Sequence, residues 1–203
     1  MRRCVEVVVA AVAVVVGAPV LAAVAIALRY RQGPPVLFRQ PRLGRGGQSF
    51  ELWKFRTMTD ERNSDGALLP DAERLTAFGR WLRSTSLDEL PELWNVLRGE
   101  MSLVGPRPLP VAYQNRFTLT EARRMEVCPG LTGWAQINGR NAVDWDERLA
   151  MDVWYVDHQS LWLDLRILAR TAGVVLSRQG VVAEGFATMH ELRQPENGTS
   201  GDR

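Results

Sequence analysis

Two adjacent carboxylates, Asp88 and Glu89, are the residues of this chain best suited to chemistry. They lie at the predicted start of a helix, where free backbone N–H groups keep a carboxylate ionised and help to hold a phosphoryl group. Ionised aspartate is a covalent nucleophile toward phosphorus, and a neighbouring glutamate takes a divalent cation or a proton. A structural role stays open at this point, because Ser86 and Glu89 have the spacing of a capping box.

A carboxylate that attacks a diphosphate needs positive charge around the phosphates, from Mg²⁺ and from fixed cations. The chain carries its candidate cations in glycine- and proline-rich turns rather than along helix faces: Lys54, Arg56, Arg83, Arg107 and Arg140. Lys54 is the single lysine among 25 basic residues. A phosphate site that needs a compact charge would explain this lysine, and chance explains it equally well.

The composition excludes several other classes of protein. The net charge of +2 lacks the strongly basic signature of a nucleic-acid-binding protein, so we expect no nucleic-acid partner. The two cysteines lie far apart without the spacing of a metal site, which favours free thiols in a reducing compartment. The two histidines are isolated as well, so we expect them to be structural or exposed rather than catalytic.

An uncharged apolar run at residues 7–28 precedes all of these motifs. About 20 apolar residues suffice to cross a bilayer, and the run is too long for the core of a signal peptide. We therefore expect membrane association. Basic residues flank both ends, and Pro19 kinks the run near its middle. The residues alone leave open a straight spanning helix or a helix that bends and leaves on the face where it entered.

The rest of the chain is predicted to form short strands and helices. Segments 36–39 (VLFR) and 50–55 (FELWKF) are predicted to be short strands, and the glycine-rich turn at 44–47 between them predicts a β-hairpin. Polar or turn-forming residues predict loops at 60–70, 104–108 and 129–134. The apolar period predicts helices at 71–83, 86–97, 119–127, 145–157 and 161–177. The last helix is strongly apolar, and core packing or a position at the membrane interface explains this equally well.

Five motifs, taken in order, make the chain similar to the bacterial sugar transferase family. They occupy residues 54–58 (KFRTM), 83–91 (RSTSLDELP), 95–102 (NVLRGEMS), 104–108 (VGPRP) and 129–140 (PGLTGWAQINGR). The chain resembles the small monotopic phosphoglycosyl transferases of this family. The resemblance implies transfer of a phospho-sugar from a UDP-sugar to polyprenol (undecaprenyl) phosphate, as the first membrane step of glycoconjugate assembly.

The resemblance also implies a role for each motif residue. Asp88 matches the nucleophile that attacks the β-phosphate, releases UMP and holds the phospho-sugar until polyprenol phosphate attacks. Glu89 matches the second member of the dyad. Mg²⁺ is implied as the cofactor, with Asp88 and Glu89 as its candidate ligands. The predicted substrate-binding residues, for the phosphates or the uridine, are Lys54, Arg56, Arg83, Arg107, Asn138 and Arg140.

The fold that the resemblance implies is α+β. It consists of a re-entrant membrane helix at 1–32, a mostly helical catalytic domain with a short β-hairpin at 33–190, and a disordered tail at 191–203. The helix is expected to break at Ala18-Pro19. The family often has serine before this proline, and Ala18 cannot bond the backbone groups that the proline frees.

The same resemblance predicts a location and a set of partners. We expect the protein in the bacterial inner membrane, with the catalytic domain on the cytoplasmic face. Expected partners are the bilayer, both substrates, downstream glycosyltransferases and a second copy of the chain. Two other functions stay open: a membrane-bound scaffold that has lost turnover, and direct transfer in a ternary complex without a covalent step.

Overall fold

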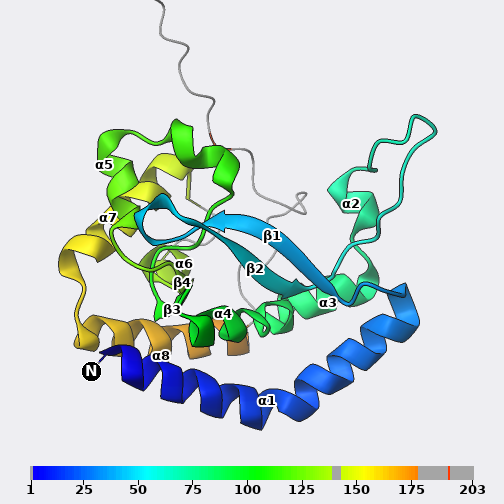
Figure 1. Cartoon of the computed structure of the whole chain (residues 1–203), viewed down its shortest axis with the longest axis horizontal. Helices are drawn as coiled ribbons and strands as arrows, with labels where there is room; N and C mark the ends of the chain where they lie inside the picture. The colour runs from blue at the N-terminus through cyan, green and yellow to red at the C-terminus, as the bar shows by residue number, and fades with distance from the viewer. Residues whose placement is uncertain (1, 139–142, 178–191, 193–203) are drawn as a thin grey trace, which may run out of the picture.

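The computed structural model describes residues 2–138, 143–177 and 192. It begins with the long helix α1 (Arg2–Gln32), which contains Pro19. Figure 1 shows that α1 bends near its middle and that both halves run along the same side of the remaining chain. A proline inside a helix removes one backbone hydrogen bond and clashes with the preceding turn, which accounts for a bend at this position.

Helix α1 exposes most of its apolar side chains. Val15 and Val16 are each 73% exposed, whereas Ala10, Val24 and Leu28 are buried against the rest of the chain. Among the described residues, α1 is the one helix long and apolar enough, by length and composition, to cross a membrane. The predicted membrane segment is therefore present as a helix with one face packed and the others uncovered.

Polar contacts tie both ends of α1 to the same domain. At the start of the helix, the guanidinium of Arg2 donates to the Tyr155 hydroxyl at 3.1 Å and pairs with the Asp164 carboxylate at 3.1 Å. At its end, the guanidinium of Arg56 donates to the backbone carbonyl of Gln32 at 2.5 Å. The two ends therefore lie on one side of the domain, with the exposed apolar middle between them (Figure 1).

The predicted β-hairpin is confirmed. Strands β1 (Leu37–Leu43) and β2 (Ser49–Phe55) are antiparallel, and the turn η1 (Arg45–Gly47) joins them. Gly46 and Gly47 have φ values of 66° and 75°, a left-handed conformation that glycine adopts without a steric penalty. The first strand was predicted at 36–39, but it begins at Leu37 and continues through Pro41 and Arg42 to Leu43.

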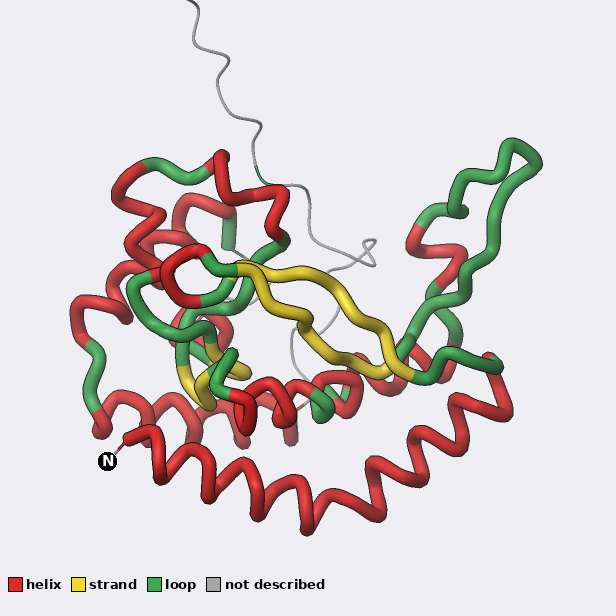
Figure 2. The backbone as a smooth tube through the Cα atoms, viewed as in Figure 1, coloured by secondary structure: helices red, strands yellow, loops and turns green. Residues whose placement is uncertain are grey.

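A second, smaller sheet was missed by the sequence reasoning. Strands β3 (Ser102–Val104) and β4 (Gly130–Thr132) pair in parallel, where the sequence predicted a loop or a turn at 104 and 130–132. Gly105 and Gly130 permit this pairing, because a Cβ atom on Gly130 would lie 2.0 Å from the Gly105 nitrogen. Figure 2 shows how small the strand content is beside the helices.

Two predicted helices are each divided in the structure. The segment 71–83 forms α2 (Asp71–Arg74) and α3 (Ala77–Ser84), because Leu75 bridges to Met58 and the Thr76 hydroxyl caps α3. The segment 86–97 forms the 3-10 turn η2 (Leu87–Glu89) and α4 (Glu92–Arg98), with Pro91 at the start of α4.

The remaining helices include two, η3 (Val111–Arg116) and α6 (Trp134–Asn138), that the sequence did not predict. The others are α5 (Leu119–Ala122), η4 (Arg123–Met125), α7 (Trp145–His158) and α8 (Leu161–Ser177). Helices α7 and α8 confirm the sequence prediction, and the single helix expected at 119–127 is α5 followed by η4. The predicted disordered tail lies outside the described residues, apart from the buried Leu192.

Helix α4 packs between α1 and the hairpin, as Figure 1 shows. Its residues Leu93 and Val96 share one core with Leu52 of β2 and Met101. The carboxylates of η2 therefore lie at the point where the end of β2, the start of α4 and the end of α3 meet. The described chain is mostly helical with few short strands, which confirms the α+β class.

Candidate active site

The backbone at Asp88 and Glu89 differs from an ordinary helix start. Ser86 adopts φ 56° and ψ 17°, a left-handed conformation that costs energy for a residue with a Cβ atom. The Ser86 side chain makes no capping hydrogen bond. The capping-box interpretation of Ser86 and Glu89 is therefore wrong, and the short turn that carries the two carboxylates is held in a strained conformation.

Glu89 forms salt bridges with two cations. The Nζ atom of Lys54 lies 2.7 Å from Glu89 Oε1, and an Nη2 atom of Arg107 lies 2.6 Å from the same oxygen. Burial opposes ionisation of Glu89, but Arg107 and Lys54 outweigh it and hold the pKa of this carboxyl well below its usual value. Three sequence motifs, which lie far apart in the chain, thus meet at one carboxylate oxygen.

Asp88 is in a different environment, although it is the next residue. Its side chain is buried, and it forms no hydrogen bond or salt bridge with another described residue. Burial, followed by the charge of Glu89, raises the pKa of Asp88, while Lys54 and Arg83 act against that shift. A carboxylate without a partner keeps its oxygen lone pairs available and is more basic than its neighbour, as a nucleophile requires.

A third carboxyl group, Glu92, was missed by the sequence reasoning. It is 2% exposed, and its Oε1 atom lies 3.0 Å from Lys54 Nζ. Burial raises the pKa of Glu92 to about 7, despite the nearby ammonium of Lys54. The signal was present in the sequence, because residues three and four apart share one helix face and Glu92 follows Glu89 and Asp88 at those spacings.

The other predicted substrate-binding residues do not all lie beside the two carboxylates. The Nε atom of Arg83 donates to the Thr57 hydroxyl at 3.1 Å, and its charge acts on Asp88. Asn138 is exposed at the end of α6, where its amide donates to the Trp134 carbonyl at 2.9 Å. Arg140 lies outside the described residues.

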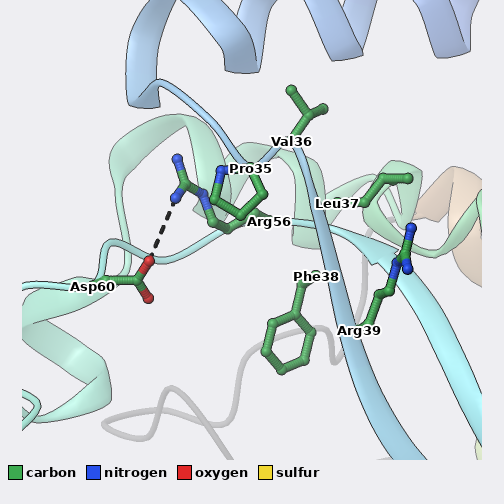
Figure 3. A pocket seen from close by; sticks show the side chains of 7 residues that line it. All are labelled: Pro35, Val36, Leu37, Phe38, Arg39, Arg56 and Asp60. Carbon is green, nitrogen blue, oxygen red and sulfur yellow. Dashed lines mark ion pairs between the residues drawn. The ribbon is translucent and has the colours of Figure 1, made fainter.

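Arg56 is held at the end of α1. Besides its bond to the Gln32 carbonyl, it donates to the Gly33 carbonyl at 2.8 Å and pairs with Asp60 at 3.5 Å. Figure 3 shows Arg56 and Asp60 at one side of an open hollow, whose other walls are the chain between α1 and β1 and the start of β1. The contacts of Arg56 are thus with the end of α1 and with this hollow, and neither Asp88 nor Glu89 lines the hollow.

The residues present fit Mg²⁺ only in company with a substrate. In the described part of the chain, no group of three or more His, Cys, Asp or Glu side chains is arranged to hold a metal ion. Mg²⁺, however, is commonly bound by one or two carboxylates together with substrate phosphates and water. Asp88 offers such a carboxylate, since its oxygens have no described partner, whereas Glu89 Oε1 already accepts from two cations.

Comparison with known proteins identifies the family of this chain. The model of the family described as "Bacterial sugar transferase" matches residues 1–178. The chain belongs to the bacterial sugar transferase family. All of the residues discussed above for the carboxylates and their cations lie inside the matched range.

Three relatives illustrate the family. An uncharacterized sugar transferase of Bacillus subtilis is 55% identical over 161 residues, which cover 79% of this chain and 80% of that protein. A UDP-glucose:undecaprenyl-phosphate glucose-1-phosphate transferase of Caulobacter vibrioides is 42% identical over 87% of this chain and 70% of its own length. The undecaprenyl-phosphate galactose phosphotransferase of Salmonella typhimurium is 42% identical, but the match covers 35% of that longer protein.

Proposed function

We propose that this protein transfers a sugar phosphate from a UDP-sugar to undecaprenyl phosphate, in two steps that share Asp88. The observation that carries the proposal is the contrast between neighbouring carboxylates: Glu89 is paired with Lys54 and Arg107, and Asp88 has no bonded partner among the residues that the structure describes. The names of the Caulobacter and Salmonella relatives support the substrate classes.

In the first step, an oxygen of Asp88 attacks the β-phosphorus of the UDP-sugar. The bond between this phosphorus and the bridging oxygen breaks, UMP leaves with both electrons of that bond, and the phospho-sugar stays on Asp88 as an acyl phosphate. Lys54, Arg83 and Arg107 provide fixed positive charge around the acidic turn, which lowers the repulsion between a carboxylate and a diphosphate. Mg²⁺, when bound beside Asp88, would supply further neutralisation of the phosphate oxygens.

In the second step, a phosphate oxygen of undecaprenyl phosphate attacks the same phosphorus. The acyl phosphate bond breaks, which regenerates the Asp88 carboxylate and yields a lipid-linked sugar diphosphate. Burial alone would raise the pKa of Glu89, but Arg107 and Lys54 outweigh this effect and hold the pKa well below its usual value. Glu89 therefore stays ionised through both steps. We assign Glu89 the role of fixing these two cations beside the reacting phosphate.

We further propose that α1 enters the membrane and leaves on the same, cytoplasmic face. The two ends of the helix are bonded to one domain, at Arg2 and at the carbonyl of Gln32, and a spanning helix would separate these ends by a bilayer. The exposed Leu161 and Trp162 of α8 suit a domain that rests on the membrane surface. This orientation makes a lipid phosphate and a soluble nucleotide accessible to one carboxylate.

The natural Cys4 tests this topology, because it is exposed near the start of α1. A Cys128→Ser variant leaves Cys4 as its one thiol. In inverted membrane vesicles an impermeant maleimide should label Cys4, and in intact cells it should not. Labelling of Cys4 from the periplasm of intact cells would reject the re-entrant helix.

Release of UMP tests the proposed reaction. Detergent-purified protein is incubated with Mg²⁺, undecaprenyl phosphate and a panel of UDP-sugars, in parallel with Asp88→Asn and with Asp65→Asn as an exposed control. We expect UMP from one donor, a normal rate for Asp65→Asn and none for Asp88→Asn. Folded wild-type protein that releases no UMP from any donor would instead favour a scaffold that has lost turnover.

A further inference from the structure

Arg42 of β1 lies on the face of the hairpin that carries the active-site lysine. Side chains of directly paired residues in an antiparallel sheet point to the same face, and those two residues apart do so as well. Lys54 pairs with Phe38, Leu52 pairs with Gln40, and Phe50 pairs with Arg42. Arg42 therefore shares its face with Lys54, and the buried Leu52 identifies that face as the inner one.

The guanidinium of Arg42 is fixed beside the loop that carries Arg107. Its Nη2 atom donates to Gln40 Oε1 at 2.6 Å, and its Nη1 atom donates to the Pro108 carbonyl at 3.3 Å. The next residue of the strand, Leu43, donates its backbone N–H to the Leu109 carbonyl at 2.9 Å. The end of β1 is thus joined to the segment that follows Arg107.

Within the described part of the chain, no carboxylate is bonded to this guanidinium, although the charge of Glu92 acts on it in the favourable direction. Among the described residues, none forms a salt bridge with Arg42, and its Nε atom is buried without a hydrogen-bond partner. Burial, and then the like charge of Arg107, lowers the pKa of Arg42 to about 10. By contrast, the buried guanidinium of Arg124 is paired with Asp152 at 2.7 Å. A half-buried cation with a buried, unused donor and a like charge acting on it is costly, unless an anion binds there.

We propose that Arg42, oriented by Gln40, binds the α-phosphate of the nucleotide donor and so holds the group that leaves as UMP. This inference rests on the proposed function and adds a residue to it. The charges that act most strongly on Asp88 include Lys54 and Arg107 but not Arg42, and Arg42 is itself acted on by the charge of Arg107. A diphosphate with its β-phosphate at Asp88 and its α-phosphate on the far side of Arg107 would meet Arg42 there.

Binding of UMP, UDP and uridine to Arg42→Met, without lipid or turnover, tests this assignment. A charge-assisted hydrogen bond is worth enough to lower affinity about 10- to 100-fold when it is lost. We expect that loss for both UMP and UDP, and no change for uridine, which has no phosphate. The matched control is Arg39→Met on the opposite face of β1, where Arg39 is exposed and stacks on Trp53 at 4.4 Å. This control should bind all three as the wild type does.

The pattern across ligands separates direct binding from an effect on the loop. If Arg42 only positioned Arg107, its loss would weaken the binding of UDP and leave the binding of UMP unchanged. Unchanged binding of UMP, with or without an effect on UDP, would therefore overturn the assignment. Arg42→Gln, which keeps a donor toward the Pro108 carbonyl, repeats the test if Arg42→Met lowers Tm. Failure of the two-step reaction looks different: UMP binding would still depend on Arg42 while Asp88→Asn released UMP normally.

Discussion

Asp152→Asn removes the negative charge from a buried ion pair with Arg124, which is bonded to the backbone of the active-site residue Arg107. The Nε and Nη2 atoms of Arg124 lie 3.1 and 2.7 Å from Asp152 Oδ2, and both side chains are 3% exposed. The same Nη2 atom donates to the Arg107 carbonyl at 2.7 Å, so the ion pair also fixes the loop whose Arg107 side chain binds Glu89. Loss of Asp152 leaves the charge of Arg124 buried without a counter-ion.

Breaking one partner of a buried pair costs about 3–5 kcal/mol. For a chain of this size each kcal/mol lowers Tm by about 2–4 °C, so Asp152→Asn should lower Tm by about 6–20 °C. Thermal unfolding of the detergent-solubilised protein measures this shift. The control is Asp157→Asn on the same helix, α7, where Asp157 pairs with the neighbouring Arg123 at the surface. Exposed pairs contribute little, and equal Tm shifts for the two variants would refute the reasoning.

Two further predictions concern packing and pH. Gly79→Ala should destabilise the fold by about 1–3 kcal/mol, because the added Cβ would lie 2.0 Å from the Thr57 carbonyl oxygen. Gly173→Ala is the control, because the space around Gly173 is open, and it should be neutral or slightly stabilising. The Tm values of the two variants test this difference. Burial raises the pKa of Glu92 from 4.5 to about 7, so the fold should lose stability as pH rises through this window. The side chain in Glu92→Gln is neutral at every pH, so the Tm of this variant should rise relative to the wild type as pH increases between those two values. A Tm difference between the two proteins that does not change with pH would contradict this prediction.

The sequence predicted the elements that local chemistry specifies. The glycine turn and flanking apolar residues predicted the hairpin, and the apolar period predicted α7 and α8. The division between α2 and α3 was missed, because it depends on a bridge between Leu75 and Met58 from a distant part of the chain. The three-residue strands β3 and β4 were missed for the same reason, since so short a strand shows no period of its own.

The site divides in a similar way. Asp88, Glu89 and Lys54 could be selected because their types and positions suggested phosphate chemistry, and the structure brings all three together. Which carboxylate is paired could not be predicted, because this depends on where the Arg107 loop meets η2. Arg42 could not be selected either, since its surroundings come from the pairing of β1 with the segment around Pro110.

Trapping of the phospho-sugar on the protein tests the central claim, that Asp88 is the nucleophile. Purified protein is mixed with Mg²⁺ and a UDP-sugar whose sugar is labelled, without undecaprenyl phosphate, and the denatured protein is assayed for label. We predict label on the wild type, discharged when undecaprenyl phosphate is added before denaturation, and none on folded Asp88→Asn. Equal label on the Asp88→Asn variant, or wild-type turnover by that variant, would contradict the account.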